Sequence, residues 1–238
     1  MTARFGSSSE LYWLEPQDLL KLGQLDEIGL RLQKLAESLA SDVVILLGDH
    51  RTGQTDKLVT GRAQLLSAEQ NGQQRLPVAV VFPIRTPRWD FFSTFMKRRR
   101  ETYRGYGTAI YHASAAELRT MNVERNIRSA ETAYNYTNKR WHHSEQERED
   151  KYAALVASMR KNGFDDHYPL EIMLRRSFGA RDTFQQGHHR MAACFEAGVD
   201  RVALRFGAAG QASGVLMPVL KWLAELKLNK KQTEIRYE

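Results

Sequence analysis

The hydrophobic positions fall into short blocks that alternate between strand and helix patterns. Residues 43–47 are an apolar, mostly β-branched run that ends at Gly48, as expected of a buried strand. Between Leu19 and Leu39 apolar residues recur at helical spacing, so we expect a helix there. The pattern predicts a mixed α/β fold, α+β in layout. Further predicted strands are 11–14, 57–60, 78–82, 108–112, 169–175, 182–184 and 202–206, and further predicted helices are 63–70, 152–159, 189–197 and 215–228.

Turn-forming residues divide this pattern into segments. Pro83 is expected to close the strand 78–82, and Ser114 with Glu117 has the spacing of a capping box at a helix start. Residues 207–214 are rich in glycine and small residues, and they read as flexible. The expected organisation is a unit at 1–86, a basic and aromatic linker at 87–107, and a second unit with a C-terminal helix at 108–238.

The two halves of the chain share an order of elements. A pattern of glycine, ten residues, glycine, two residues and arginine occurs at 61–75 and again at 187–201, and each copy precedes a β-type apolar run. Residues 11–19 similarly parallel residues 110–118. We interpret this as two tandem copies of one α/β unit. Chance similarity between two ordinary helix–glycine–strand units remains the alternative.

Composition narrows the class of protein. The 238-residue chain has a formal net charge of +7 and one cysteine. Cys194 therefore has no intrachain disulfide partner, and a reducing, cytoplasmic location fits best. The N-terminus does not read as a signal peptide, and no apolar run is long enough to span a membrane. The positive charge suggests a polyanionic partner without distinguishing DNA from nucleotide phosphates.

A basic segment with interleaved aromatic residues stands in the predicted linker. Such segments suit nucleic acid, because basic side chains contact phosphates and aromatic rings stack on bases. A solvated linker is the alternative. The candidate nucleic-acid contacts are Lys97, Arg98, Arg99, Arg100 and Arg104.

The most informative motif is the turn Gly187-His188-His189-Arg190 between a predicted strand and a predicted helix. Glycine allows a tight turn, the first helical N–H groups point at its centre, and the helix dipole favours an anion there. Arg190 can hold a phosphate through two hydrogen bonds. The strand–turn–helix context favours a phosphate site over a merely capped helix with exposed histidines.

This stretch resembles the ParB/sulfiredoxin superfamily, whose turn reads Gly-Glu-Arg-Arg in partition proteins, Gly-Cys-His-Arg in sulfiredoxins and Asp-Gly-His-His-Arg in free-serine kinases. The resemblance covers residues 108–206, with a weaker match in the first half. It implies a nucleotide-binding fold in which Gly187, His188, His189 and Arg190 contact phosphates. The sulfiredoxin cysteine is replaced by His188, and the acid before the glycine in the kinases is Gln186 here.

The same resemblance places residues 122–128 beside the nucleotide. Arg125 and Arg128 are then phosphate contacts, and Glu124 is the candidate acid or base, with ordinary charge pairing on a solvated helix as the alternative. Glu171 is a further candidate carboxylate. Paired histidines at 142–143 have poor geometry for a metal, so no metal-binding residues are predicted.

Together these features favour a nucleotide-dependent enzyme that acts on phosphate bonds: a phosphotransferase or NTPase, or a DNA nuclease. ATP or another nucleotide is the expected cofactor, with Mg²⁺ as a candidate, and His188, His189 and Glu124 are the candidate catalytic residues. DNA is a second candidate partner. The alternative function is a non-catalytic DNA-binding or adaptor protein on the same scaffold.

Overall fold

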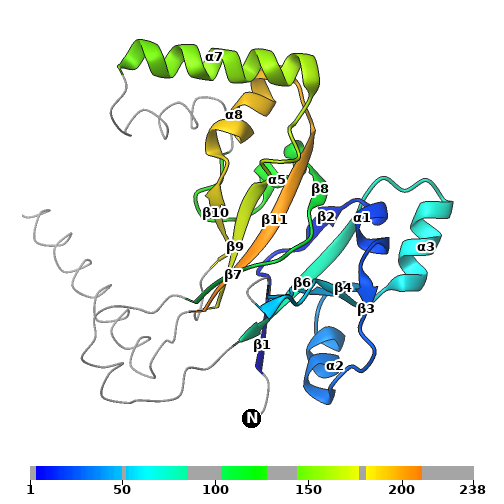
Figure 1. The fold of residues 1–238 in the computed structure, drawn as a ribbon. Helices are drawn as coiled ribbons and strands as arrows, with labels where there is room; N and C mark the ends of the chain where they lie inside the picture. The colour runs from blue at the N-terminus through cyan, green and yellow to red at the C-terminus, as the bar shows by residue number, and fades with distance from the viewer. Residues whose placement is uncertain (1–3, 50–51, 85–102, 128–143, 177–180, 211–238) are drawn as a thin grey trace, which may run out of the picture.

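The computed structural model describes residues 4–49, 52–84, 103–127, 144–176 and 181–210. One mixed sheet runs through both halves of the chain, with helices packed on it (Figure 1). The described helices are α1 (Pro16–Leu20), α2 (Leu30–Glu37), α3 (Arg62–Gln70), α5 (Ala115–Thr120), α7 (Glu145–Asn162) and α8 (His188–Ala197). The strands are β1 (Arg4–Ser7), β2 (Tyr12–Leu14), β3 (Gly23–Gln24), β4 (Val43–Leu46), β5 (Lys57–Thr60), β6 (Leu76–Ile84), β7 (Tyr103–Tyr106), β8 (Tyr111–Ser114), β9 (Leu170–Arg176), β10 (Thr183–Gln186) and β11 (Arg201–Gly210).

The two halves of the sheet, residues 4–84 and residues 103–210, repeat one pairing scheme. The strand order is β10-β9-β11-β8-β2-β6-β4-β5-β3, with β1 on β6 and β7 on β11. In the first half β6 pairs parallel with β4 and antiparallel with β2 and β1. In the second half β11 pairs parallel with β9 and antiparallel with β8 and β7. The halves join where β2 and β8 pair.

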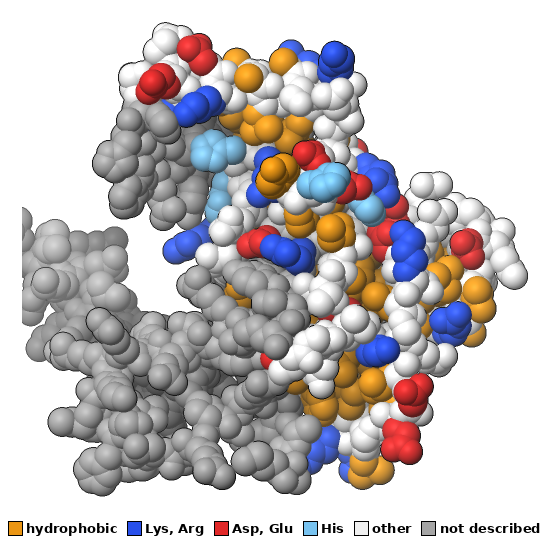
Figure 2. Space-filling view, viewed as in Figure 1, with side chains coloured by type: hydrophobic (Ala, Val, Ile, Leu, Met, Phe, Trp, Pro, Cys, Tyr) orange, Lys and Arg blue, Asp and Glu red, His pale blue; other side chains and the backbone are white. Residues whose placement is uncertain are grey.

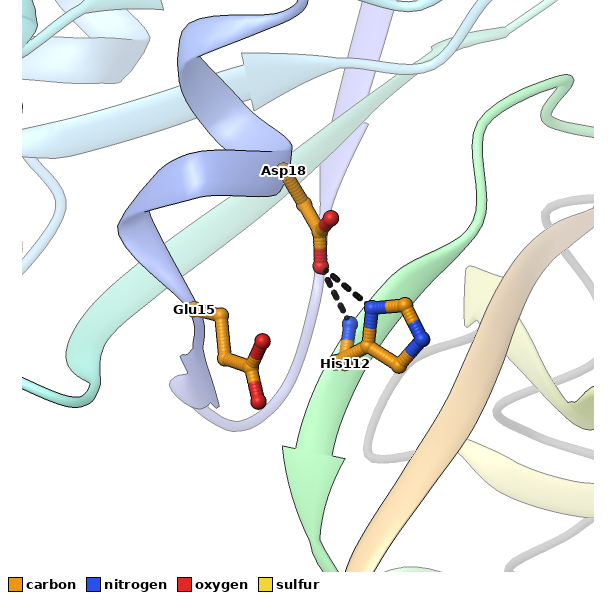
Figure 3. A group of neighbouring side chains, drawn as sticks. All are labelled: Glu15, Asp18 and His112. Atoms are coloured by element: carbon orange, nitrogen blue, oxygen red, sulfur yellow. Dashed lines mark hydrogen bonds and ion pairs between the residues drawn. The ribbon is translucent and has the colours of Figure 1, made fainter. Parts of the chain in front are cut away.

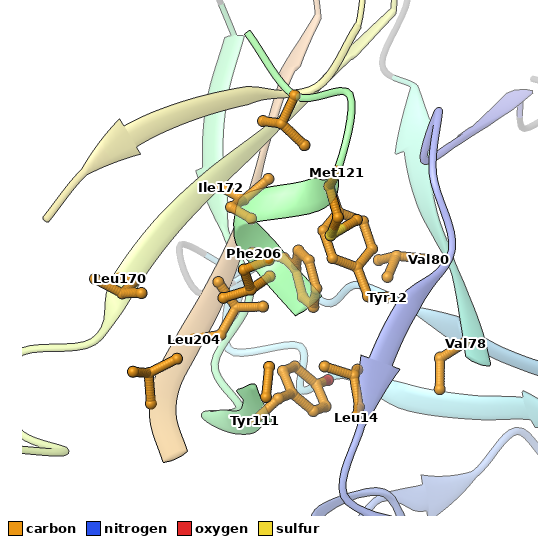
Figure 4. Packing of buried hydrophobic residues seen from close by; sticks show 14 of the residues in the cluster. Tyr12, Leu14, Val78, Val80, Tyr111, Met121, Leu170, Ile172, Leu204 and Phe206 are labelled. Atoms are coloured by element: carbon orange, nitrogen blue, oxygen red, sulfur yellow. The ribbon is translucent and has the colours of Figure 1, made fainter. Parts of the chain in front are cut away.

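The main core lies at this junction. Tyr12 faces Val78 in the first half, and Tyr111 faces Leu204 in the second. Both tyrosines are fully buried, and their ring centroids lie 4.7 and 5.6 Å from that of Phe206 (Figure 4). Burial of several large aromatic and aliphatic side chains in one cluster is the main stabilising contribution, at about 25 cal/mol per Å² of apolar surface. The halves therefore share one core.

The helices cover the two halves differently. In the first half α2 buries Leu32 and Ala36 against the sheet face opposite the main core. In the second half the long helix, α7, packs on α8 and adds Val156 and Met159 to the main core. Thus α2 precedes β4 and α7 precedes the corresponding strand, β9, but the two helices pack on different faces of the sheet.

The mixed α/β class predicted from the sequence is confirmed, with several local corrections. The stretch 19–39 is not one helix, because the backbone at Gly23 pairs with β5 and only α2 follows. Pro83 does not end β6; it faces Phe5 at the edge of the sheet, where β1 pairs with β6. Residues 207–210 belong to β11 rather than to a flexible segment, because β7 pairs with them.

Serine hydroxyls cap two helices of the second half. Ser114 caps α5 by accepting from the Glu117 backbone N–H, as expected. The helix predicted at 152–159 extends back to Ser144, where a full capping box starts α7, and it ends at Gly163. The predicted helix 215–228 lies outside the described residues. No described helix is both long and apolar enough to cross a membrane.

Candidate phosphate-binding turn

The turn between β10 and α8 has the geometry that the sequence predicts. Gly187 is the N-cap of α8 with φ of 100°, in the left-handed region that favours glycine. A Cβ there would lie 2.6 Å from Cδ2 of Leu170, the first residue of β9. Ser114 and Ser144 cap α5 and α7 with their hydroxyls, whereas glycine has no side chain to do so. The start of α8 thus presents backbone rather than a capping group.

The helix supplies positive potential at this turn. The N–H of Met191 bonds the Gly187 carbonyl at 2.8 Å, which closes the first turn of α8. The N–H groups that precede it in any α-helix have no acceptor within the helix, and they form the positive end of the helix dipole. An anion at this position would meet several aligned donors.

Arg190 adds a guanidinium on the same turn. Its Nη1 donates to the Pro169 carbonyl at 3.1 Å, which anchors the side chain beside the start of β9. Burial lowers the pKa of Arg190, and the nearby carboxylates of Glu171 and Asp165 oppose that effect. A guanidinium has five N–H donors, so one bond to a carbonyl still allows a two-pronged phosphate contact.

The two histidines lie in different environments. The ring of His188 packs edge-on against Phe184, with centroids 4.9 Å apart. His189 is exposed, and partial desolvation together with the Arg190 charge lowers its pKa. Of the pair, His189 is therefore the one that solvent and ligands reach more readily. In Figure 2 histidine, basic and acidic side chains gather on the face below α7.

Glu124 lies beside the strand that leads into the turn. Its backbone N–H bonds the Asp182 carbonyl at 2.7 Å, and its own carbonyl accepts from Phe184 at 2.8 Å. The Thr183 hydroxyl donates to the Glu124 carboxylate at 3.3 Å. The next residue, Arg125, is exposed with φ of 59°, a strained value for a non-glycine residue. The structure thus places Glu124 on the edge of β10, against residues that lie three to five positions before Gly187.

Sequence reasoning missed the ion pair between Glu171 and Arg205. Glu171 on β9 is 9% exposed and pairs with the Arg205 guanidinium on β11. The two residues are direct neighbours in the parallel β9–β11 register. They are 34 positions apart in the chain, so only the sheet register brings them together.

A second polar cluster joins the halves of the molecule (Figure 3). The Asp18 carboxylate accepts from the backbone N–H of His112 at 2.8 Å and lies 2.8 Å from the ring Nδ1. The His112 Nε2 lies 2.9 Å from the Asp166 carboxylate. No local sequence pattern points to this cluster, because the two carboxylates lie 94 and 54 positions from His112 in the chain.

Three side chains of this cluster also lie close enough together to hold a metal ion. One ligand atom each of Glu15, Asp18 and His112 lies within 4.8 Å of the others. Glu15 already forms two bonds with the Arg201 guanidinium, at 2.9 and 3.0 Å, and Asp18 binds Lys21 at 3.0 Å. These two cations neutralise the carboxylates and repel a further cation. The cluster therefore reads as an ion-pair network between the halves.

Part of the predicted site lies outside the described residues. This applies to Arg128 and to the basic residues 97–100, while Arg104 has a described backbone in β7. Their roles stay predictions. Comparison with known proteins adds no relative: no family model, no curated protein and no solved structure matches the chain.

Proposed function

We propose that the turn Gly187–Arg190 binds the phosphates of a nucleotide and that the protein is a nucleotide-dependent enzyme acting on phosphate bonds. The observation that carries the proposal is the meeting of a glycine-started helix with an anchored guanidinium. Both features attract an anion, and both act at the same end of α8. The resemblance to the ParB/sulfiredoxin turn supports the same assignment.

The repeated pairing scheme supports a second part of the proposal, that the chain holds two tandem units of this type. Gly61 starts α3 with φ of 99°, almost the value at Gly187, and a Cβ there would meet the first residue of β4. After this glycine the first half has Arg62, Ala63 and Gln64 in place of two histidines and Arg190. The second unit is then the active one, and the first serves as its structural partner.

The expected chemistry depends mainly on positioning and charge. Phosphoryl transfer or hydrolysis needs the phosphates held in line with an attacking oxygen and their developing charge neutralised. In this proposal Arg190 and the α8 N–H groups hold the phosphates, and His189 faces the ligand. Glu124 is the candidate acid or base, because its carboxylate accepts from Thr183 on the strand that leads into the turn. ATP or a related nucleotide with Mg²⁺ is the expected cofactor.

The first test is a calorimetric titration of the full chain with ATP, ADP and CTP in the presence of Mg²⁺. Arg190→Ala should abolish binding or weaken it at least tenfold, because it removes a charge-assisted, two-pronged contact. Gln64→Ala is the matched control, since Gln64 occupies the same position in the first half. Binding that is unchanged in Arg190→Ala would contradict the assignment of the turn.

The reaction type follows from a second measurement on the same proteins. Nucleotide turnover that depends on Arg190 would favour a phosphotransferase or NTPase, and Arg190-dependent DNA cleavage would favour a nuclease. DNA binding without turnover, sensitive to salt and to substitution of residues 97–100, would instead support the adaptor function. A loss of DNA affinity at higher salt would by itself indicate contacts to phosphates and would not show recognition of a base sequence.

A further inference from the structure

The two halves differ sharply at one pair of facing positions. In the first half Val44 on β4 faces Ala79 on β6, and both are buried. In the second half the corresponding facing pair is Glu171 on β9 and Arg205 on β11. An apolar pair under α2 has thus been replaced by an ion pair at the same place in the sheet. The first half, in which α2 covers this pair, forms the same strand pairing without charge there.

A third charged residue accompanies this pair. Arg190 stands three positions after Gly187, and Gln64 stands three positions after Gly61. The second half therefore has two arginines and a glutamate where the first half has glutamine and two apolar residues. Because the strand pairing forms without these three charges in the first half, they are candidates for a function in the second.

The geometry connects all three charges. The Arg205 guanidinium contacts the Glu171 carboxylate directly, and 36% of the Arg205 side chain remains exposed. The same carboxylate lies close enough to Arg190 to favour its charged form. Glu171 also pairs with Gln186, the residue before Gly187, so this nearly buried carboxylate is paired with Arg205 and lies beside the turn that carries Arg190. Replacing a well-packed apolar pair with such an ion pair gives no net stability as a rule, because desolvating the charges is costly.

We propose that Arg205 is a second phosphate-binding arginine and that the Glu171 carboxylate, paired with Arg205 beside the Gly187–Arg190 turn, occupies the anion position until phosphate displaces it. This inference rests on the proposed function of the Gly187–Arg190 turn. A dianionic phosphate group between two guanidinium groups gains more than one carboxylate does, since it carries more charge and more acceptor oxygens. Glu171 then limits affinity for weaker anions and is a negative determinant of binding.

The test measures binding of inorganic pyrophosphate to the full chain by calorimetry. Glu171→Gln keeps the size of the side chain and removes its charge, so affinity should rise about tenfold. Arg205→Met leaves Glu171 buried without its partner, so the more informative variant is E171Q/R205M. The double variant should bind about tenfold more weakly than E171Q. Arg201→Met is the control, since Arg201 lies on the same strand but bonds Glu15.

The outcomes separate this inference from the proposed function. If Arg190→Ala weakens pyrophosphate binding but E171Q binds no more tightly than the wild type, the role of Glu171 is wrong and the turn still binds phosphate. If E171Q/R205M binds as tightly as E171Q, the role of Arg205 is wrong. If neither the wild type nor E171Q binds pyrophosphate, both proposals fail. Thermal unfolding of each variant confirms that it is folded.

Discussion

The hydroxyl of Tyr111 donates a hydrogen bond to the Asp56 carboxylate at 2.8 Å across the junction between the halves. Tyr12 makes the reciprocal bond to Asp182, also at 2.8 Å. Each half thus donates one tyrosine hydroxyl to an aspartate of the other half. Burial, followed by the adjacent aspartate charge, raises the pKa of both phenols well above the ordinary value. The phenols therefore stay protonated donors, and the two bonds fasten the halves to each other.

Tyr111→Phe and Tyr12→Phe should each lower the free energy of unfolding by about 1.5–3 kcal/mol, the usual range for a hydrogen bond to a charged group. The loss is not larger because backbone N–H groups also bond these carboxylates: Ser9 to Asp182, and Gly48 to Asp56. Urea unfolding measures the effect.

Tyr152→Phe is the control for these variants, because the Tyr152 hydroxyl bonds Glu196 on the surface. It should change stability by less than about 1 kcal/mol. A junction tyrosine whose substitution costs no more than the control would show that the reciprocal bonds do not hold the halves together.

Three glycine-to-alanine substitutions should destabilise the protein in a fixed order. Gly198 has φ of 72° and open space around it, so alanine there costs about 1 kcal/mol from the left-handed backbone alone. At Gly187 a Cβ also meets the Leu170 side chain at 2.6 Å. At Gly61 it meets the Val43 backbone at 2.7 Å and the Asp42 carbonyl at 2.8 Å, neither of which can rotate away.

We expect Gly61→Ala to cost most, about 3 kcal/mol or more, with Gly187→Ala in between. Urea unfolding midpoints of the three variants give the order directly. A cost at Gly61 no greater than at Gly198 would mean that α3 is not held against β4 as the structure shows.

Cys194 should be unreactive in the folded protein. The side chain is buried, and burial raises the pKa of its thiol from the ordinary value of 9.0 to about 12. The thiolate is the reactive form, so a thiol reagent at pH 8 should label Cys194 only after unfolding in denaturant. The raised pKa contributes stability below pH 9, which is lost as the pH rises toward 12. Rapid labelling of the native protein would contradict this burial.

Phosphate binding should strengthen as the pH falls through the titration range of His189. Desolvation, followed by the Arg190 charge, lowers the pKa of His189 in the free protein, and a bound phosphate would favour its protonated form. A proton taken up on binding tightens affinity at lower pH. For a folded protein without ligand the sign is opposite: the depressed pKa costs stability as the pH falls below about 6.5.

His189→Asn separates this effect from protonation of the phosphate itself. Pyrophosphate titrations from pH 8 to pH 5.5 should show a smaller pH dependence in the variant than in the wild type. Identical slopes would place His189 away from the ligand.

The sequence alone identifies much of the local structure of this protein. Residues 43–46, 57–60 and 62–70 form the predicted elements because hydrophobic periodicity and glycine conformation act over a few residues. The turn at Gly187 is predictable for the same reason. The extent of β6 and β11 is not, since their ends exist only where β1 and β7 pair with them.

Long-range relationships depend on the sheet register. Tyr111 and Asp56, or Glu171 and Arg205, look unrelated in the sequence, and no local pattern joins residues 55 or 34 positions apart. The 19–39 segment is divided because Gly23 and Gln24 pair with β5, which outweighs a helical spacing of leucines. The sequence by itself determined most of the elements, the glycine turns and the Gly187–Arg190 motif, because these depend on neighbouring residues. Only the tertiary structure decided which charges meet, since burial and strand register bring distant residues into contact.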